Sequence, residues 1–182
     1  MAAARSVALL AASAALAVGC TAARPAPPPA PAGAATVVRV VDGDTLVARV
    51  GGAERAVRLI GIDTPESKKP GAAVECYAHE AAARLAELAP PGAAVTLVRD
   101  AEAQDRYGRL LAYVIRAAGP EDRGGLFVNL TLAAEGFADV LEVAPNTTFS
   151  AAFASAAGAA RAGRLGLWGA CGGGHEPAPA QA

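Results

Sequence analysis

The sequence predicts a β-rich α+β domain, a five-stranded OB-type barrel with three helices, and three observations support this fold class. Short β-branched runs, separated by turn residues, recur over 36–62 and again over 94–116. One helical pattern lies between the third and fourth runs, and two more follow the fifth run. Five short strands with a helix inserted after the third are typical of this barrel.

The first three strands are expected to form a meander. Residues 36–41 and 45–50 alternate between apolar and polar side chains on either side of Asp42-Gly43-Asp44, which is a strong hairpin signal. Gly51-Gly52 forms a second tight turn, and the third strand is expected over 53–62.

The later elements follow from periodicity and from turn residues. A helix with alanine and leucine on one face ends at Pro90-Pro91-Gly92, because proline cannot continue a helix. Two strands and two helices are expected after it. The five predicted ranges are 75–89 (helix), 94–99 and 109–116 (strands), and 126–135 and 149–162 (helices).

The N-terminus resembles an export signal. Residues 1–19 carry one early charge, Arg5, followed by an apolar run over 6–18 that is too short to span a bilayer comfortably. Cys20 follows small residues, as in the lipobox of bacterial lipoproteins, in which that cysteine is lipidated. We therefore expect an exported protein of the cell envelope, lipid-anchored at Cys20 and without a spanning helix. A plain secretory signal with a secreted product is the alternative.

The composition then divides the exported chain. Residues 20–35 are rich in proline and alanine and predict a semi-rigid linker. Residues 36–171 have the length of one domain, and residues 172–182 form a Gly, Pro and Ala tail that is expected to be disordered.

Charge and cysteine content limit the function. Without Arg5 the chain has 15 basic and 17 acidic residues, a net charge of −2, so it lacks the basic surface of a general nucleic-acid coat protein. Any polyanionic partner must therefore be attracted by a local cluster of charges and a metal ion.

Cys76 and Cys171 lie at opposite ends of the domain, and in an exported protein two such cysteines are candidates for a disulfide. A free, buried Cys76 and a mobile Cys171 are the alternative.

Four carboxylates are predicted to converge. Asp42 and Asp44 flank the glycine of the first hairpin, on the same face of the strand. Asp63 and Glu66 follow at the end of the third strand. Carboxylates that meet near a main-chain carbonyl form an oxygen-only site, which suits Ca²⁺ better than zinc. Alone, the Asp-Gly turn would be read as structural, since it is common in turns.

Two arginines complete this predicted site. Arg58 lies in a mostly buried strand, where an unpaired charge would be costly. Arg109 opens the fifth strand, and together the two guanidinium groups could clamp a phosphate in bidentate fashion. The structural alternative for Arg58 is an ion pair with an aspartate that closes the barrel. The structural alternative for Arg109 is a surface arginine at a turn. Calcium, two arginines and a carboxylate that activates water together fit phosphodiester hydrolysis.

Three sequence blocks carry a resemblance to a known family. Val41-Asp42-Gly43-Asp44-Thr45 is the first, Arg58-Leu59-Ile60-Gly61-Ile62-Asp63-Thr64-Pro65-Glu66 the second, and Asp105-Arg106-Tyr107-Gly108-Arg109-Leu110-Leu111-Ala112-Tyr113 the third. They resemble the signature blocks of the staphylococcal-type nuclease (thermonuclease) family, in the family's order and near its spacing. The resemblance extends from about Thr36 to Trp168.

The resemblance implies a calcium site. Asp44 and Asp63 match the family's direct Ca²⁺ ligands, with the main-chain carbonyl of Thr64 as a further ligand. Asp42 matches a nearby acidic position outside the direct ligands. The implied reaction is calcium-dependent cleavage of DNA and RNA at the 5′-oxygen side of phosphorus, which leaves 3′-phosphates. A monomer that prefers single strands is expected.

The resemblance also assigns roles to residues around the phosphate. Glu66 matches the carboxylate that activates or orients water, and Arg58 and Arg109 match the phosphate-clamping arginines. Arg106 and Tyr107 match positions that contact a terminal phosphate of a bound nucleotide. Near 140–145, where the family's type member has base-stacking tyrosines, this chain has Glu142 and Ala144 and is one residue shorter, so altered binding is expected.

Two other functions compete with hydrolysis. An OB-fold can bind single-stranded nucleic acid without cutting it, but such a module has no need of Glu66 and would use more aromatic residues than the 4% present. An inert envelope lipoprotein with a nuclease-like barrel would have no reason to keep these arginines and carboxylates together. Cleavage assays with calcium and with a chelator distinguish the three.

Overall fold

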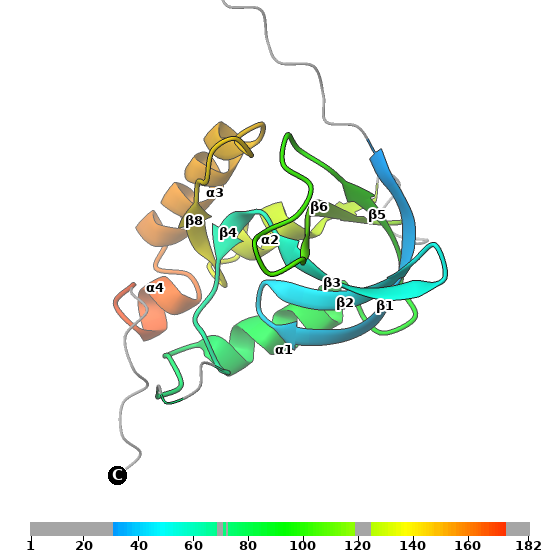
Figure 1. Cartoon of the computed structure of the whole chain (residues 1–182). Helices are drawn as coiled ribbons and strands as arrows, with labels where there is room; N and C mark the ends of the chain where they lie inside the picture. The colour runs from blue at the N-terminus through cyan, green and yellow to red at the C-terminus, as the bar shows by residue number, and fades with distance from the viewer. Residues whose placement is uncertain (1–30, 69–70, 72, 119–124, 174–182) are drawn as a thin grey trace, which may run out of the picture.

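The computed structural model describes residues 31–68, 71, 73–118 and 125–173 of the chain. Figure 1 shows a strongly curved barrel with helices beside it, so the molecule is α+β as predicted. The strands are β1 (Pro31–Asp42), β2 (Thr45–Val50), β3 (Ala53–Leu59), β4 (Gly61–Asp63), β5 (Ala94–Val98), β6 (Leu110–Arg116), β7 (Leu126–Phe127) and β8 (Asp139–Leu141). The helices are α1 (Ala78–Leu88), α2 (Val128–Ala134), α3 (Ser150–Ala162) and α4 (Leu167–Ala170).

Five strands form the barrel, which confirms the expected OB-type architecture. The main sheet has the order β3-β2-β1-β5-β6-β7, and it closes where β3 pairs with β6 in parallel. Val57 and Leu59 of β3 are fully buried, and Arg58 between them points to the opposite face because side chains alternate along a strand. Barrel closure therefore fixes Arg58 on a strand that is paired on both sides.

A buried amide joins α2 to the closing strands. The side chain of Asn129 is fully buried and accepts a hydrogen bond from the N–H of Val114 at 2.8 Å. Its Nδ2 donates to the carbonyls of Ile60 (2.9 Å) and Ala112 (3.3 Å). Ile60 directly follows β3, and Ala112 and Val114 lie in β6, so one side chain holds α2 and both closing strands together.

Aromatic rings fill the core between β6 and α3. The ring of Tyr113 packs edge-on against Phe149 and Phe127, with centroids 4.7 and 5.9 Å apart. Phe153 of α3 is fully buried and lies 6.1 Å from the Tyr113 centroid. Rings of this kind bury much apolar area, so they anchor α3 firmly to the barrel.

The predicted third strand, 53–62, is broken at Ile60. Gly61 has a φ of +86°, which turns the chain into β4, and β4 pairs with β8 rather than with the main sheet. A Cβ on Gly61 would lie 2.2 Å from the ring of Phe153, so only glycine fits here. The pairing with β8 was not predicted, because it depends on residues about eighty positions away in the sequence.

The predicted ends of three other elements also differ. β1 begins at Pro31, so 31–35, which we assigned to the linker, pair instead with β5. The helix predicted from residue 75 begins at Ala78, because Tyr77 has a left-handed φ of 71°. Residues 126–127 pair with β6 before α2 begins. The short helix α4 was not predicted.

A disulfide connects the region before α1 to the C-terminal end of the domain. Cys76 and Cys171 are bonded, and 95 residues separate them in the sequence. Cys171 packs, together with Tyr77, against a small second cluster of buried residues, Ala160, Leu167 and Trp168. The guanidinium of Arg161 lies 4.2 Å from the centre of the Trp168 ring. This corner is thus held by one covalent bond and few apolar contacts.

Some expectations fall outside the part of the chain that the structure describes. These are the signal peptide (1–19), Cys20, the linker up to residue 30 and the tail from residue 174. Among the described helices, none has the length and apolar character needed to cross a bilayer.

Candidate phosphodiester-binding and metal site

The tip of the first hairpin lies against the end of β4. β1 and β2 meet at Asp42 and Thr45, which are paired across the turn. Gly43 permits this approach, because a Cβ there would lie 2.6 Å from Oγ1 of Thr64. Asp44 is consequently only 7% exposed, which is rare for a carboxylate without partners. The hairpin tip therefore lies beside the turn that follows β4, and Asp42, Asp44, Asp63 and Glu66 line one cavity there.

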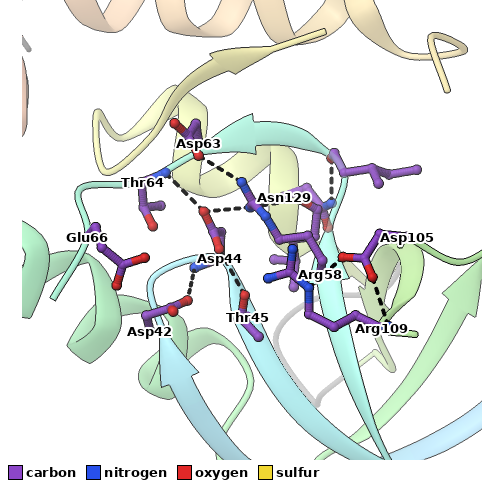
Figure 2. A network of polar contacts seen from close by, with 12 residues as sticks. Asp42, Asp44, Thr45, Arg58, Asp63, Thr64, Glu66, Asp105, Arg109 and Asn129 are labelled. Atoms are coloured by element: carbon purple, nitrogen blue, oxygen red, sulfur yellow. Dashed lines mark hydrogen bonds and ion pairs between the residues drawn. The ribbon is translucent and has the colours of Figure 1, made fainter. Parts of the chain in front are cut away.

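Arg58 lies between two of these carboxylates, as Figure 2 shows. Its Nη1 is 2.5 Å from Oδ2 of Asp44, and its Nη2 donates to Oδ1 of Asp63 at 2.7 Å. Nη1 also donates to the carbonyl of Leu59 at 3.3 Å. A single guanidinium thus brings together the aspartates of two separate strands, and the Arg–Asp pairing that we considered as a structural alternative exists as well.

Asp44 is held rigidly in addition to its ion pair. The hydroxyl of Thr45 donates to its Oδ1 at 3.0 Å, and the N–H of Thr64 donates to its Oδ2 at 3.1 Å. Burial raises the pKa of Asp44, although the Arg58 guanidinium and the Thr64 N–H oppose this. Burial and the charge of Asp44 likewise raise the pKa of Asp42. The crowded carboxylates favour any additional positive charge.

Glu66 lines the same cavity and is oriented by two neighbours. Its Oε1 accepts a hydrogen bond from the N–H of Lys68 at 2.7 Å. Its own main-chain N–H donates to Oε2 of Glu75 at 2.8 Å. The cavity has a volume of about 500 Å³ and contains five carboxylates and two guanidinium groups among the described residues that line it. We call it the acidic cavity; its charged residues are Asp42, Asp44, Arg58, Asp63, Glu66, Glu75 and Arg109.

Arg109 reaches the acidic cavity from the loop before β6. Its Nε donates to Oδ2 of Asp105 at 2.6 Å, while Oδ1 of Asp105 accepts the N–H groups of Tyr107 and Arg109 at 2.9 and 3.0 Å. Partial burial raises the pKa of Asp105, but these hydrogen bonds outweigh it, so the pKa is lowered and the carboxylate stays ionised. We did not predict Asp105 as a site residue; its signal was the Asp-x-x-Gly turn directly before Arg109.

A second cavity of about 400 Å³ adjoins the first, and Arg58 and Arg109 line both. Its wall includes Arg106 and Tyr107, with the guanidinium of Arg106 4.8 Å from the Tyr107 ring centroid. Tyr107 is 69% exposed, so its ring is open to a ligand. We call this the apolar cavity.

The end of β8 and the residues after it contribute aliphatic side chains to the apolar cavity. Leu141 and Val143 line it and are 40% and 56% exposed. Glu142 and Ala144, which the sequence analysis placed where the family has base-stacking tyrosines, are not among the residues that line this cavity. The wall therefore offers apolar contact from this segment but no aromatic stacking.

The donor set fits a hard divalent cation. Within the described part of the chain, no three Asp, Glu, His or Cys side chains already form a metal cluster. Instead the Arg58 guanidinium lies between Asp44 and Asp63, and the carbonyl-bearing turn at Thr64 is adjacent. The nearby donors are oxygen atoms, as Ca²⁺ prefers, and carboxylates outnumber guanidinium groups in the cavity. By donor chemistry the residues suit Ca²⁺.

Comparison with known proteins agrees with this geometry. Residues 56–170 match the family model described as staphylococcal nuclease homologue. The chain is 36% identical over 132 residues to the thermonuclease of Staphylococcus intermedius, a match that covers 72% of this chain and 74% of that protein.

Two relatives come from Bacillus subtilis (strain 168). The chain is 36% identical over 134 residues to the endonuclease YncB and 37% identical over 134 residues to the SPbeta prophage-derived endonuclease YokF. Each match covers 73% of this chain, but only 60% of YncB and 43% of YokF. With a family model that matches most of the domain and a barrel of the expected topology, the chain belongs to the staphylococcal nuclease homologue family.

Proposed function

We propose that the protein is a calcium-dependent phosphodiesterase that cuts DNA and RNA at the 5′-oxygen side of phosphorus and leaves 3′-phosphates. The observation that carries this proposal is the acidic cavity, where Arg58 contacts Asp44 and Asp63 while Glu66 and Arg109 line the same space. The named nucleases among its relatives support it further.

In the proposed reaction a water oxygen attacks phosphorus and the bond from phosphorus to the 5′-oxygen breaks. Glu66 accepts a proton from that water, and the departing 5′-oxygen takes a proton from solvent. Arg58 and Arg109 donate hydrogen bonds to the non-bridging oxygens, where negative charge increases in the transition state. Asp105 fixes the Nε of Arg109, so the other nitrogens of that guanidinium can face the phosphate.

The proposed metal ligands are Asp44, Asp63 and the main-chain carbonyl of Thr64, with Asp42 acting through water. Bound Ca²⁺ would supply a Lewis acid for the phosphoryl oxygens. Arg58, which now pairs with both aspartates, would then exchange carboxylate oxygens for phosphate oxygens. The site is thereby arranged to bind cation and phosphate together.

The apolar cavity is the proposed position of the neighbouring nucleotide. Arg106 and Tyr107 would contact its terminal phosphate, and Leu141 with Val143 would contact the base. A base must leave a duplex to enter such a cavity, so single strands are the preferred substrate in this proposal. The exported chain has a net charge of −2, which should weaken nonspecific binding to nucleic acid.

The proposed location is the cell envelope, with lipid on Cys20 as the anchor and a monomer as the working form; secretion is the alternative. The support is the apolar run over 6–18 and the small residues before Cys20. The Cys76–Cys171 disulfide agrees with an oxidising compartment.

The test is incubation of the purified protein with denatured DNA and with RNA, in Ca²⁺ or in excess chelator. We expect cleavage with Ca²⁺ only, and products with a 3′-phosphate and a 5′-hydroxyl by end-group analysis. Binding without cleavage would instead indicate a single-strand-binding module. Neither binding nor cleavage would indicate an inert barrel, and undiminished cleavage in chelator would contradict the role of the carboxylates.

A further inference from the structure

Glu75 is joined to Glu66 by two hydrogen bonds that the proposed chemistry does not use. The N–H of Glu66 donates to Oε2 of Glu75 at 2.8 Å, and the N–H of Glu75 donates to the carbonyl of Glu66 at 3.0 Å. Together they bring the two ends of the 66–75 segment into contact. We call this pair of hydrogen bonds the Glu66–Glu75 clasp.

The clasp lies next to the disulfide in the sequence. Cys76 follows Glu75 directly and is bonded to Cys171, just after α4. Tyr77, in a left-handed conformation, then leads into α1, and its ring lies 5.4 Å from that of Phe137. The main chain at Glu75 is therefore held on its C-terminal side by the disulfide and by ring packing.

The apolar contacts at this corner are few. The second cluster contains three buried residues, Ala160, Leu167 and Trp168, with Tyr77 and Cys171 packed against it. The N-terminal end of α1 has no side-chain cap. The carbonyl of Glu75 accepts a hydrogen bond from the N–H of Ala78 at 3.2 Å, and the disulfide adds a covalent restraint at the next residue, Cys76.

We propose that Glu75 is a positioning residue for Glu66 and that the Cys76–Cys171 disulfide keeps Glu75 in place, so that turnover depends on the oxidised state of this bond. This inference rests on the proposed role of Glu66. Glu75 acts through its acceptor oxygen on the Glu66 N–H, and it fixes the main chain from which the Glu66 carboxylate extends. A displacement of about 1 Å at a reacting group can lower a rate about 100-fold.

The first test uses the full chain with Glu75→Ala, Glu75→Gln and the control Glu80→Ala. Glu80 is an exposed carboxylate in the first turn of α1. We expect Glu75→Ala to lower kcat about 10- to 100-fold with little change in KM, as for other supporting residues. Glu75→Gln keeps an acceptor oxygen for the Glu66 N–H and should retain most activity. If Gln is as damaging as Ala, the carboxylate charge itself is needed and the positioning role is wrong.

The second readout is independent of activity. Amide hydrogen exchange of the Glu66 N–H, followed by NMR, reports the clasp directly. We expect faster exchange in Glu75→Ala, by about 10-fold or more, and unchanged exchange in Glu80→Ala. Unchanged exchange in Glu75→Ala would overturn the proposal, as would faster exchange with an unchanged kcat. Failure of the proposed function looks different, because the unaltered chain would then not cut at all.

The third test removes the disulfide. Dithiothreitol, a dithiol, transfers two electrons and two protons, which breaks the S–S bond, leaves thiols on Cys76 and Cys171 and converts the reagent to its cyclic disulfide. Cys76→Ser/Cys171→Ser mimics this state without reductant, and Cys20→Ala controls for the third cysteine. We expect kcat and Glu66 exchange to change as in Glu75→Ala, while Cys20→Ala stays active and remains sensitive to dithiothreitol.

Combining the changes tests whether the disulfide acts through Glu75. Adding Glu75→Ala to Cys76→Ser/Cys171→Ser should cause little further loss, since both remove the same restraint. The disulfide would not act through Glu75 if the kcat losses of the two sets of changes multiply in the combined variant. The same conclusion would follow if the reduced chain is as active as the oxidised one. Circular dichroism establishes that each variant is folded at the assay temperature. If the cysteine variant is unfolded there, Glu75→Ala, Glu75→Gln and the exchange rates decide the matter.

Discussion

Replacing Glu66 by glutamine is expected to lower kcat by about 10²- to 10⁴-fold, the range typical for loss of a general base. Glutamine has nearly the same shape and can still accept the Lys68 N–H, so the surrounding hydrogen bonds persist. The main-chain clasp to Glu75 also remains. The loss should therefore come from the missing proton acceptor. Steady-state kinetics on single-stranded DNA gives kcat and KM separately.

The same variant should bind DNA almost as well as the unaltered chain. Glu66 makes no favourable contact with a polyanion, and removing its charge slightly reduces repulsion. Fluorescence anisotropy with a labelled single strand measures this affinity. Equal losses of turnover and binding would contradict the assigned role and would point to a general disturbance of the acidic cavity.

Replacing Arg109 by alanine is expected to lower kcat by about 10²- to 10³-fold, as for removal of one donor that stabilises transition-state charge. Arg109 is partly exposed and its carboxylate partner Asp105 lies in the same loop. The free energy of unfolding should therefore change by less than about 1 kcal/mol, because exposed ion pairs contribute little. Cleavage kinetics and urea denaturation together measure both effects.

Arg58 provides the contrasting case. Its removal should cost a similar factor in kcat and, in chelator, about 3 kcal/mol of stability, because it leaves a buried carboxylate without its cation. The side chains of Arg58 and Asp44 are only 13% and 9% exposed. Arg58→Lys should recover stability better than activity, since an ammonium group cannot form the bidentate contacts of a guanidinium. If Arg58→Ala leaves the free energy of unfolding unchanged in chelator, Arg58 does not stabilise the fold by pairing with the Asp44 carboxylate.

Local signals predicted the parts of the site that depend on neighbouring residues. The Asp-Gly-Asp turn identifies the hairpin because turn chemistry is set by adjacent residues. The charge of Arg58 within an apolar strand indicates a special environment, because a buried charge requires partners. Both inferences need only a short stretch of sequence, and the structure shows the hairpin and the Arg58 partners.

Contacts between distant segments were not accessible in the same way. The Glu66–Glu75 clasp depends on the path of the chain between these residues, and their charges alone suggest repulsion. The strand β8, which brings Leu141 to the apolar cavity, is three residues long and has no pattern of its own. The break at Gly61 arises from packing against Phe153, about ninety residues further along the chain. Tertiary contact decides each of these features.

The most direct measurement of the central claim is a crystal structure of the Glu66→Gln chain with Ca²⁺ and a short single-stranded DNA. The proposal predicts one Ca²⁺ about 2.3–2.6 Å from carboxylate oxygens of Asp44 and Asp63 and from the Thr64 carbonyl. It also predicts one phosphate that accepts hydrogen bonds from both Arg58 and Arg109. A calcium ion bound elsewhere, or a phosphate held by neither arginine, would contradict it.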